Sequence, residues 1–294
     1  MDRQPTLARR FFDRLEPVHA VTYFAPEART ALDDLGYKGF WMGYFAARSA
    51  PLGQVPPEVV TAAFYNFAPH RVAKALPGAW EVAPPADALR VRLQSAVAAL
   101  ERYGVGHGDD VATAADLLAE AARNATMDGR PLFAANAALP WPDEPLAKLW
   151  HATTLLREQR GDGHIAVLVG HGISGRESNV LHAAAGRVPK EMIMRSRDYD
   201  DEQWESYRSR LADRGLIDGD ELTDAGRDLK QRIEDATDEL ALPVLDALSD
   251  DEIETLFRAL TPITRKVVAG GDVPAATPMG LNRDDLDDDS AHLA

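Results

Sequence analysis

Isolated charged and polar side chains stand inside strongly apolar segments in the first half of the chain. Arg48 closely follows the aromatic-rich run 40–45, and Asn66 lies between two aromatic residues. A charge or an amide buried without a partner costs several kcal/mol, so each of these side chains needs a partner or a ligand. Glu27 could neutralise Arg48 in an internal salt bridge. The alternative is a ligand pocket with aromatic walls and a few convergent polar groups.

A second polar region follows in the other half of the chain. Two arginines, Arg157 and Arg160, stand just before a Gly-Asp-Gly sequence at 161–163. Asp162 suits the N-cap of a helix that starts near Gly163, and a helix N-terminus beside two arginines could hold an anion. Across both regions, the predicted ligand-binding residues are Tyr23, Arg48, Tyr65, Asn66, Arg157 and His164.

Acid–base chemistry is the alternative function that these residues allow. His19 and Glu27 could work as acid and base, and an enzyme would need a polar and aromatic pocket between the helical lobes that holds Glu27, Arg48 and His164. The catalytic candidates are therefore His19, Glu27 and His164. Neither the reaction nor a cofactor can be named, since no nucleophile elbow, phosphate loop or dinucleotide fingerprint is present. The histidines include no close metal-binding pair, and we predict no metal site.

The composition is that of a globular protein with an acidic surface. The chain has 294 residues, of which 45 % are apolar, and no cysteine, which excludes disulfides and thiolate chemistry. Its formal net charge of −15 opposes binding to phosphate backbones, because nucleic-acid affinity comes mainly from Lys and Arg. No apolar run has membrane-spanning length and no apolar signal region follows Met1. We therefore expect a cytoplasmic protein without membrane partners.

Helical periodicity dominates the chain, and β-branched alternation is almost absent. A proline cluster between 128 and 144 predicts a boundary. The prediction is a mainly α fold with two helical lobes, the first at 1–127 and the second, a winged helix with a small two-stranded wing, at 145–270. Residues 271–294 are expected to form an acidic, flexible tail. Besides the winged-helix segment, the predicted helices are Arg3–Leu15, Pro26–Leu35, Tyr37–Arg48, Pro57–Tyr65, Pro69–Leu76, Asp87–Tyr103, Val111–Ala125, Ala147–Gln159, Gly163–Gly170, Gly175–Ala185, Pro189–Ser196 and Asp250–Leu260.

Residues 200–241 have the order helix, short hairpin and second helix. Gly215 ends the first helix, the Asp-Gly pair at 218–219 predicts a tight turn between two short strands, and Thr223 caps the second helix. This segment resembles the recognition helix and wing of MarR-type regulators, and the resemblance extends over residues 175–262. The resemblance implies a regulator scaffold.

The whole chain is also similar to an uncharacterised actinobacterial family that is labelled helix-turn-helix. This resemblance brings no established reaction with it. It is carried by the sequences Tyr-Phe-Ala-Pro-Glu at 23–27, Tyr-Phe-Ala-Ala-Arg-Ser-Ala-Pro-Leu-Gly at 44–53, Tyr-Asn-Phe at 65–67 and Leu-Arg-Glu-Gln-Arg-Gly-Asp-Gly-His at 156–164.

The charge of the predicted recognition helix makes DNA a doubtful partner. The N-terminus of such a helix normally faces base edges and phosphates, yet four carboxylates stand there and the wing turn is acidic too. The leading prediction is therefore a small-molecule-binding protein, a regulator with weak or lost DNA binding, and a homodimer is allowed. The carboxylates are Asp200, Asp201, Glu202 and Glu205, and the DNA-binding candidates that remain are Arg187, Lys190, Arg195 and Arg197.

Overall fold

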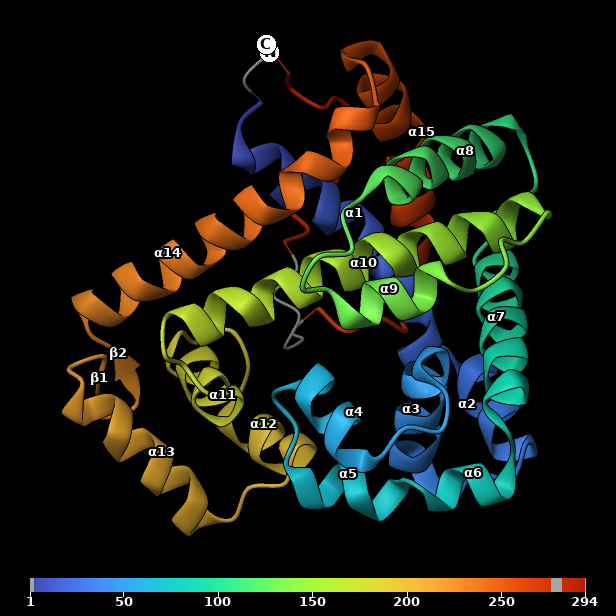
Figure 1. The fold of residues 1–294 in the computed structure, drawn as a ribbon. Helices are drawn as coiled ribbons and strands as arrows, with labels where there is room; N and C mark the ends of the chain where they lie inside the picture. Colours follow the sequence, from blue (N-terminus) through green and yellow to red (C-terminus); the bar gives the residue numbers. More distant parts are fainter. Residues whose placement is uncertain (1–2, 276–281, 294) are drawn as a thin grey trace.

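The computed structural model describes residues 3–275 and 282–293 (Figure 1). It is built from helices and one two-stranded antiparallel sheet, in which Ile217 pairs with Leu222 and Asp218 with Glu221. The predicted mainly α fold with a small wing is confirmed. The elements up to the central helix are α1 (Pro5–Phe24), α2 (Pro26–Asp34), α3 (Gly39–Ser49), η1 (Ala50–Leu52), α4 (Pro57–Phe64), α5 (Pro69–Ala75), α6 (Gly78–Val82), α7 (Pro85–Arg102), α8 (Asp109–Asn124), α9 (Pro131–Ala137) and α10 (Pro145–Gly170). After it come α11 (Gly175–Ala184), α12 (Lys190–Arg197), α13 (Asp201–Asp213), β1 (Ile217–Asp218), β2 (Glu221–Leu222), α14 (Asp224–Ala241), η2 (Leu242–Ala247) and α15 (Asp250–Ala269).

Helix α10 crosses the middle of the molecule, with α8 and α9 beside one part of it and α14 beside the other (Figure 1). Its Leu149, Trp150 and Leu155 belong to a core that also takes residues from α1, α7, α8 and α15. Helices from the beginning and the end of the chain thus share one hydrophobic core. The lobe boundaries at 1–127 and 145–270 stay a prediction.

Two smaller cores lie on either side of the loop between α4 and α5. One is aromatic and joins α3 to α6 around Phe45, Phe64 and Phe67. The other joins the wing to α11–α14 around Trp204 and Leu211. The segment formed by α11–α14 and the wing therefore has its own core and meets the aromatic one at this loop.

Helix α10 is continuous where the sequence predicted a break. Its first turn is capped by Glu144, whose carboxylate accepts the N–H groups of Leu146 and Ala147. Asp162 is not an N-cap: it is buried inside the helix and accepts the N–H of Phe133 at 2.9 Å. A Cβ on Gly163 would lie 3.7 Å from Leu240 of α14. The predicted helix N-terminus with an anion site at 161–163 is wrong, because helix packing on both faces carries α10 through the glycines.

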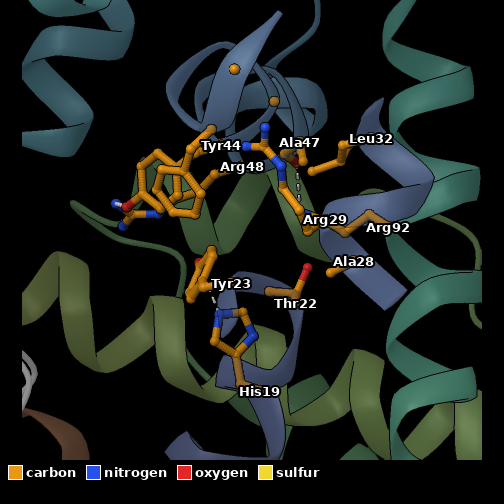
Figure 2. Close-up of a pocket in the computed structure, with 13 residues that line it drawn as sticks. His19, Thr22, Tyr23, Ala28, Arg29, Leu32, Tyr44, Ala47, Arg48 and Arg92 are labelled. Atoms are coloured by element: carbon orange, nitrogen blue, oxygen red, sulfur yellow. Dashed lines mark hydrogen bonds between the residues drawn. The ribbon is translucent and has the colours of Figure 1, made fainter. Parts of the chain in front are cut away.

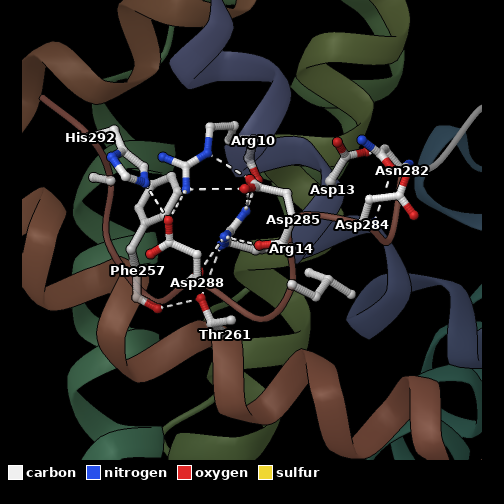
Figure 3. A network of polar contacts seen from close by, with 12 residues as sticks. Arg10, Asp13, Arg14, Phe257, Thr261, Asn282, Asp284, Asp285, Asp288 and His292 are labelled. Atoms are coloured by element: carbon white, nitrogen blue, oxygen red, sulfur yellow. Dashed lines mark hydrogen bonds and ion pairs between the residues drawn. The ribbon is translucent and has the colours of Figure 1, made fainter.

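The described part of the acidic tail, 282–293, lies against α1 and α15 (Figure 3). Arg14 is fully buried there and donates to the backbone carbonyls of Asp285 at 2.9 Å and Asp288 at 2.6 Å. Arg10 donates to the Asp285 carboxylate at 2.6 Å. The flexibility predicted for 271–294 stays a prediction.

Candidate ligand-binding site

A small cavity lies where α1, α2, α3 and α7 meet (Figure 2). Figure 2 shows the α1 side chains on one side of it and Tyr44 and Arg48 of α3 across from them. The volume is about 20 Å³, which is room for about one water molecule. The lining residues are His19, Thr22, Tyr23, Ala28, Arg29, Leu32, Gly39, Phe40, Gly43, Tyr44, Ala47, Arg48 and Arg92.

Helices α1 and α3 each present two residues to the cavity, because side chains four positions apart lie on the same face of a helix. On α1 these are His19 and Tyr23, and on α3 they are Tyr44 and Arg48. Gly43 allows α3 to come close to α2, since a Cβ there would lie only 3.2 Å from Leu32. The cavity therefore has an aromatic wall with charged groups behind it.

His19 is held in place by two side-chain hydrogen bonds. Its Nδ1 lies 3.0 Å from the Thr154 hydroxyl and its Nε2 lies 3.0 Å from the Tyr23 hydroxyl. The imidazole also stacks on Trp150, with 6.0 Å between ring centroids. Burial lowers its pKa well below the usual range, so the ring is neutral and one nitrogen donates while the other accepts.

Behind the aromatic wall lies a buried ion-pair network. Arg48 donates to both oxygens of Glu158, at 3.3 and 3.2 Å. Arg157 donates to Glu158 at 2.9 Å and to Glu16 at 3.2 Å. Burial alone would raise the pKa of Glu158, but the guanidinium groups of Arg157 and Arg48 outweigh it and hold that pKa below its usual range. Pairing offsets part of the cost of desolvation, but burial still raises the pKa of Glu16.

The residues predicted for acid–base work do not come together. Glu27 does not neutralise Arg48, because its carboxylate pairs with Arg102 near the surface. His164 bonds to the Thr237 hydroxyl at 2.9 Å, between α10 and α14, and burial lowers its pKa to about 4. His19 alone of the three lines the cavity.

Tyr65 and Asn66 face α11 and the residues just before it rather than the cavity. The Tyr65 hydroxyl donates to the carbonyl of Ile173, and Asn179 of α11 donates to the carbonyl of Asn66 at 2.9 Å. A Cβ on Gly175 would lie 2.0 Å from the carbonyl oxygen of Tyr65. The structure thus brings Tyr23 and Arg48 to the cavity, places Arg157 behind them and puts Tyr65 and Asn66 at an interface.

The four DNA-binding candidates are divided between surface and interior. Arg187 and Arg195 are exposed. The Lys190 ammonium lies 5.6 Å from the ring of Trp204, and the half-buried Arg197 lies over the ring of Phe67 at 4.3 Å. Arg197 is therefore engaged within the molecule.

Arg92 and Glu158 are site residues that the sequence reasoning missed. Arg92 stands in line with Ala88, Ala96 and Ala99 on the buried face of α7. A charged residue at such a position in an amphipathic helix signals a buried charge that needs a partner. Glu158 is likewise a charged residue at a buried position of a helix, because it follows the buried Thr154 by four residues on α10.

Comparison with known proteins gives one match. A family model described as a helix-turn-helix family matches residues 8–274. No curated protein and no solved structure matches the chain. Among the residues that the structure describes, no three His, Asp or Glu side chains gather as a metal site. In the same part of the chain, no helix has the length and apolar character to cross a bilayer.

Proposed function

Since the chain belongs to a helix-turn-helix family, we propose that it is a regulator that binds a small molecule in the cavity of α1, α2, α3 and α7. A bound ligand changes the packing of α12 and, through it, of the helix-turn-helix part, which comprises α11–α14 and the wing. The cavity has aromatic walls and a few fixed polar groups, as ligand sites do, and a ligand larger than one water molecule must displace part of its wall. The family supplies the regulator-type scaffold.

One set of contacts carries this proposal. The ring of Tyr44, which lines the cavity, lies 5.5 Å from the ring of Phe67. The guanidinium of Arg197, at the end of α12, lies 4.3 Å from the same Phe67 ring. A ligand that moves Tyr44 thereby changes the surface on which α12 packs, and packed side chains pass such shifts on.

The loop that holds Phe67 is fixed to both neighbours. Tyr65 adopts φ 52°, a backbone conformation that costs energy for a bulky residue and that persists only where contacts enforce it. Its hydroxyl bond to Ile173 and the Asn179 bond to Asn66 supply those contacts. This fixed loop supports a mechanical link between the cavity and α11–α12.

Weak DNA binding is the second part of the proposal. Helix α13 stands directly before the wing, where MarR-type regulators have their recognition helix. Its exposed N-terminal residues include Asp201, Glu202 and Glu205, and Asp218 and Asp220 are exposed on the wing. Carboxylates there repel phosphates, so we propose that this surface contacts a protein rather than a duplex.

A screen of neutral, anionic and cationic aromatic fragments by ligand-observed NMR tests the cavity site. Thr22 lines the cavity and is 7 % exposed, so Thr22→Phe fills it, whereas Thr22→Val keeps its volume as a matched control. We expect fragments that bind the wild type and Thr22→Val but not Thr22→Phe. Equal binding to all three proteins, or to none, contradicts the proposal.

A further inference from the structure

Arg92 is a buried cation without a carboxylate partner in residues 3–275 and 282–293. It lines the cavity from α7 and is 6 % exposed. Its Nη1 donates to the carbonyl of Ala47 at 3.1 Å and its Nη2 to the side-chain oxygen of Asn136 at 3.2 Å. Both acceptors are neutral, and in the described residues its buried Nε has no hydrogen-bond partner.

The carboxylates of the neighbouring network are already in use. Glu158 forms ion pairs with Arg48 and Arg157, and Glu16 forms one with Arg157. Arg92 adds a third guanidinium beside these side chains, and no carboxylate of the described residues forms an ion pair with it. Burial lowers the pKa of Arg92 to about 10, which still leaves the group charged at neutral pH. An unbalanced buried charge is costly, so an anion beside Arg92 would relieve that cost.

The lining of the cavity combines charged and apolar side chains. His19, Arg48 and Arg92 contribute polar groups, whereas Leu32 and Phe40 are apolar. Phe40 is 41 % exposed, so the wall of the cavity extends to the surface there. A volume of about 20 Å³ admits only a small group beside Arg92, so the rest of a ligand must lie toward the exposed Phe40.

We propose that the ligand is a small organic monocarboxylate whose anionic group reaches Arg92 and whose apolar body lies toward Leu32 and Phe40. This inference depends on the proposed function and names its ligand class. One negative charge matches the one guanidinium of the cavity wall that has only neutral acceptors in the described residues. A planar carboxylate also suits the flat guanidinium, and hydrogen bonds between charged groups are the stronger kind.

Calorimetric titration with benzoate, benzamide and benzylamine tests the charge preference. These probes have similar shape and differ in charge. We expect the wild type to bind benzoate at least about tenfold more tightly than benzamide and to bind benzylamine more weakly still. Equal or tighter binding of benzamide or benzylamine, or no binding of benzoate at millimolar concentration, overturns the inference.

Variants of Arg92 test whether this residue causes the preference for benzoate over benzamide. Arg92→Met keeps the packing volume and is expected to bind benzoate and benzamide alike, whereas Arg92→Lys is expected to keep part of the preference. Arg90→Met is the matched control, since Arg90 is exposed on the same helix and pairs with Asp87. A preference that survives in Arg92→Met overturns the inference. If Arg92→Met fails to fold, the wild-type ratio and Arg92→Lys still decide.

Different results would contradict the cavity site and its preference for anions. Neutral fragments that bind the wild type but not Thr22→Phe would keep the cavity site and overturn its anion preference. Benzoate that binds the wild type and Thr22→Phe equally would overturn the cavity site itself.

Discussion

The guanidinium of Arg197 lies 4.3 Å from the ring centroid of Phe67. Through this contact, the last residue of α12 packs on the aromatic core that includes the cavity wall. The Arg197 Nε is buried and has no hydrogen-bond partner in the described residues. The Arg197 side chain is therefore held on the core by the Phe67 ring. The proposed link between the cavity and α12 depends on this one contact.

Arg197→Met is expected to loosen α12. A desolvated cation–π contact is worth about 1 to 2 kcal/mol, so the amides of residues 190–197 should exchange roughly five- to thirtyfold faster. Hydrogen exchange followed by mass spectrometry measures this, with α15 as the internal control. Unchanged exchange over 190–197 would show that Arg197 does not hold α12.

The buried network predicts a large effect for one neutral substitution. Glu158→Gln leaves Arg48 and Arg157 without their shared carboxylate, and breaking a buried ion pair costs about 3 to 5 kcal/mol. Urea unfolding at neutral pH measures the loss. Asp33→Asn, which breaks the exposed pair with Arg29, is the control and should cost at most about 1 kcal/mol. Similar losses in both variants would contradict the assigned role of Glu158.

Replacing Asp162 with asparagine is expected to stabilise the protein by an amount that depends on pH. Burial is the main cause that raises its pKa from 3.8 to about 7 in the folded chain. A raised pKa means that the protonated form stabilises the fold at low pH and that this contribution disappears as the pH rises through about 7. Asp162→Asn cannot ionise, so it should be more stable than the wild type at pH 8, by on the order of 4 kcal/mol.

The gain from Asp162→Asn should vanish below about pH 4, where the wild-type carboxyl is protonated in both states. Urea unfolding at pH 4, 6 and 8 checks the trend. A stability difference that does not change with pH would mean that Asp162 does not titrate as burial predicts.

Two glycines give opposite predictions for the same substitution. Gly175→Ala brings a Cβ to 2.0 Å from the carbonyl oxygen of Tyr65, so α11 must move away from the loop and stability should fall by about 2 kcal/mol or more. Gly163→Ala meets only ordinary contacts at 3.7 Å and should stabilise α10 by about 0.5 to 1 kcal/mol. Thermal unfolding compares them, and a loss in both variants would contradict the close approach at Gly175.

The acidic face of α13 predicts that charge reversal creates duplex binding. The wild type should not shift a random duplex at 50 mM salt in fluorescence anisotropy. The triple variant Asp201→Lys, Glu202→Lys, Glu205→Lys should bind, with an affinity that falls steeply as salt increases. The control has the same charge change at the exposed Asp228, Glu239 and Glu120 and should bind more weakly. Tight wild-type binding would contradict the proposed loss of DNA affinity.

The local elements were predictable because they depend on neighbours in the sequence. Thr223 caps α14 through the N–H of Gly226, as the sequence indicated. A tight turn joins the two strands as predicted, but Asp218 pairs with Glu221 in the sheet, so the turn residues are Gly219 and Asp220. The continuous α10 was not predicted, because tertiary packing on both sides of Gly163 overrides the weak helix propensity of glycine. Local signals therefore give most elements, although α6 and α9 are absent from the predicted helices. Packing decides where the long helix ends.

The candidate site was predicted only in part. Tyr23 and Arg48 stood out because polar groups inside aromatic segments need partners, and both line the cavity. The partner of Arg48 was misassigned to Glu27, since Glu158 is 110 residues away in the chain and sequence spacing carries no information about such a contact. Arg92 was missed for the same reason, because its cavity forms only when α7 meets α1 and α3.

Hydrogen exchange in the presence of a bound fragment tests whether ligand binding in the cavity reaches α12. The tightest fragment of the screen is added at saturating concentration to the wild type and to Arg197→Met. We expect exchange over residues 190–197 to change by at least about threefold in the wild type and much less in Arg197→Met. A wild-type response confined to α1, α2, α3 and α7, with α12 unchanged, would contradict this expectation.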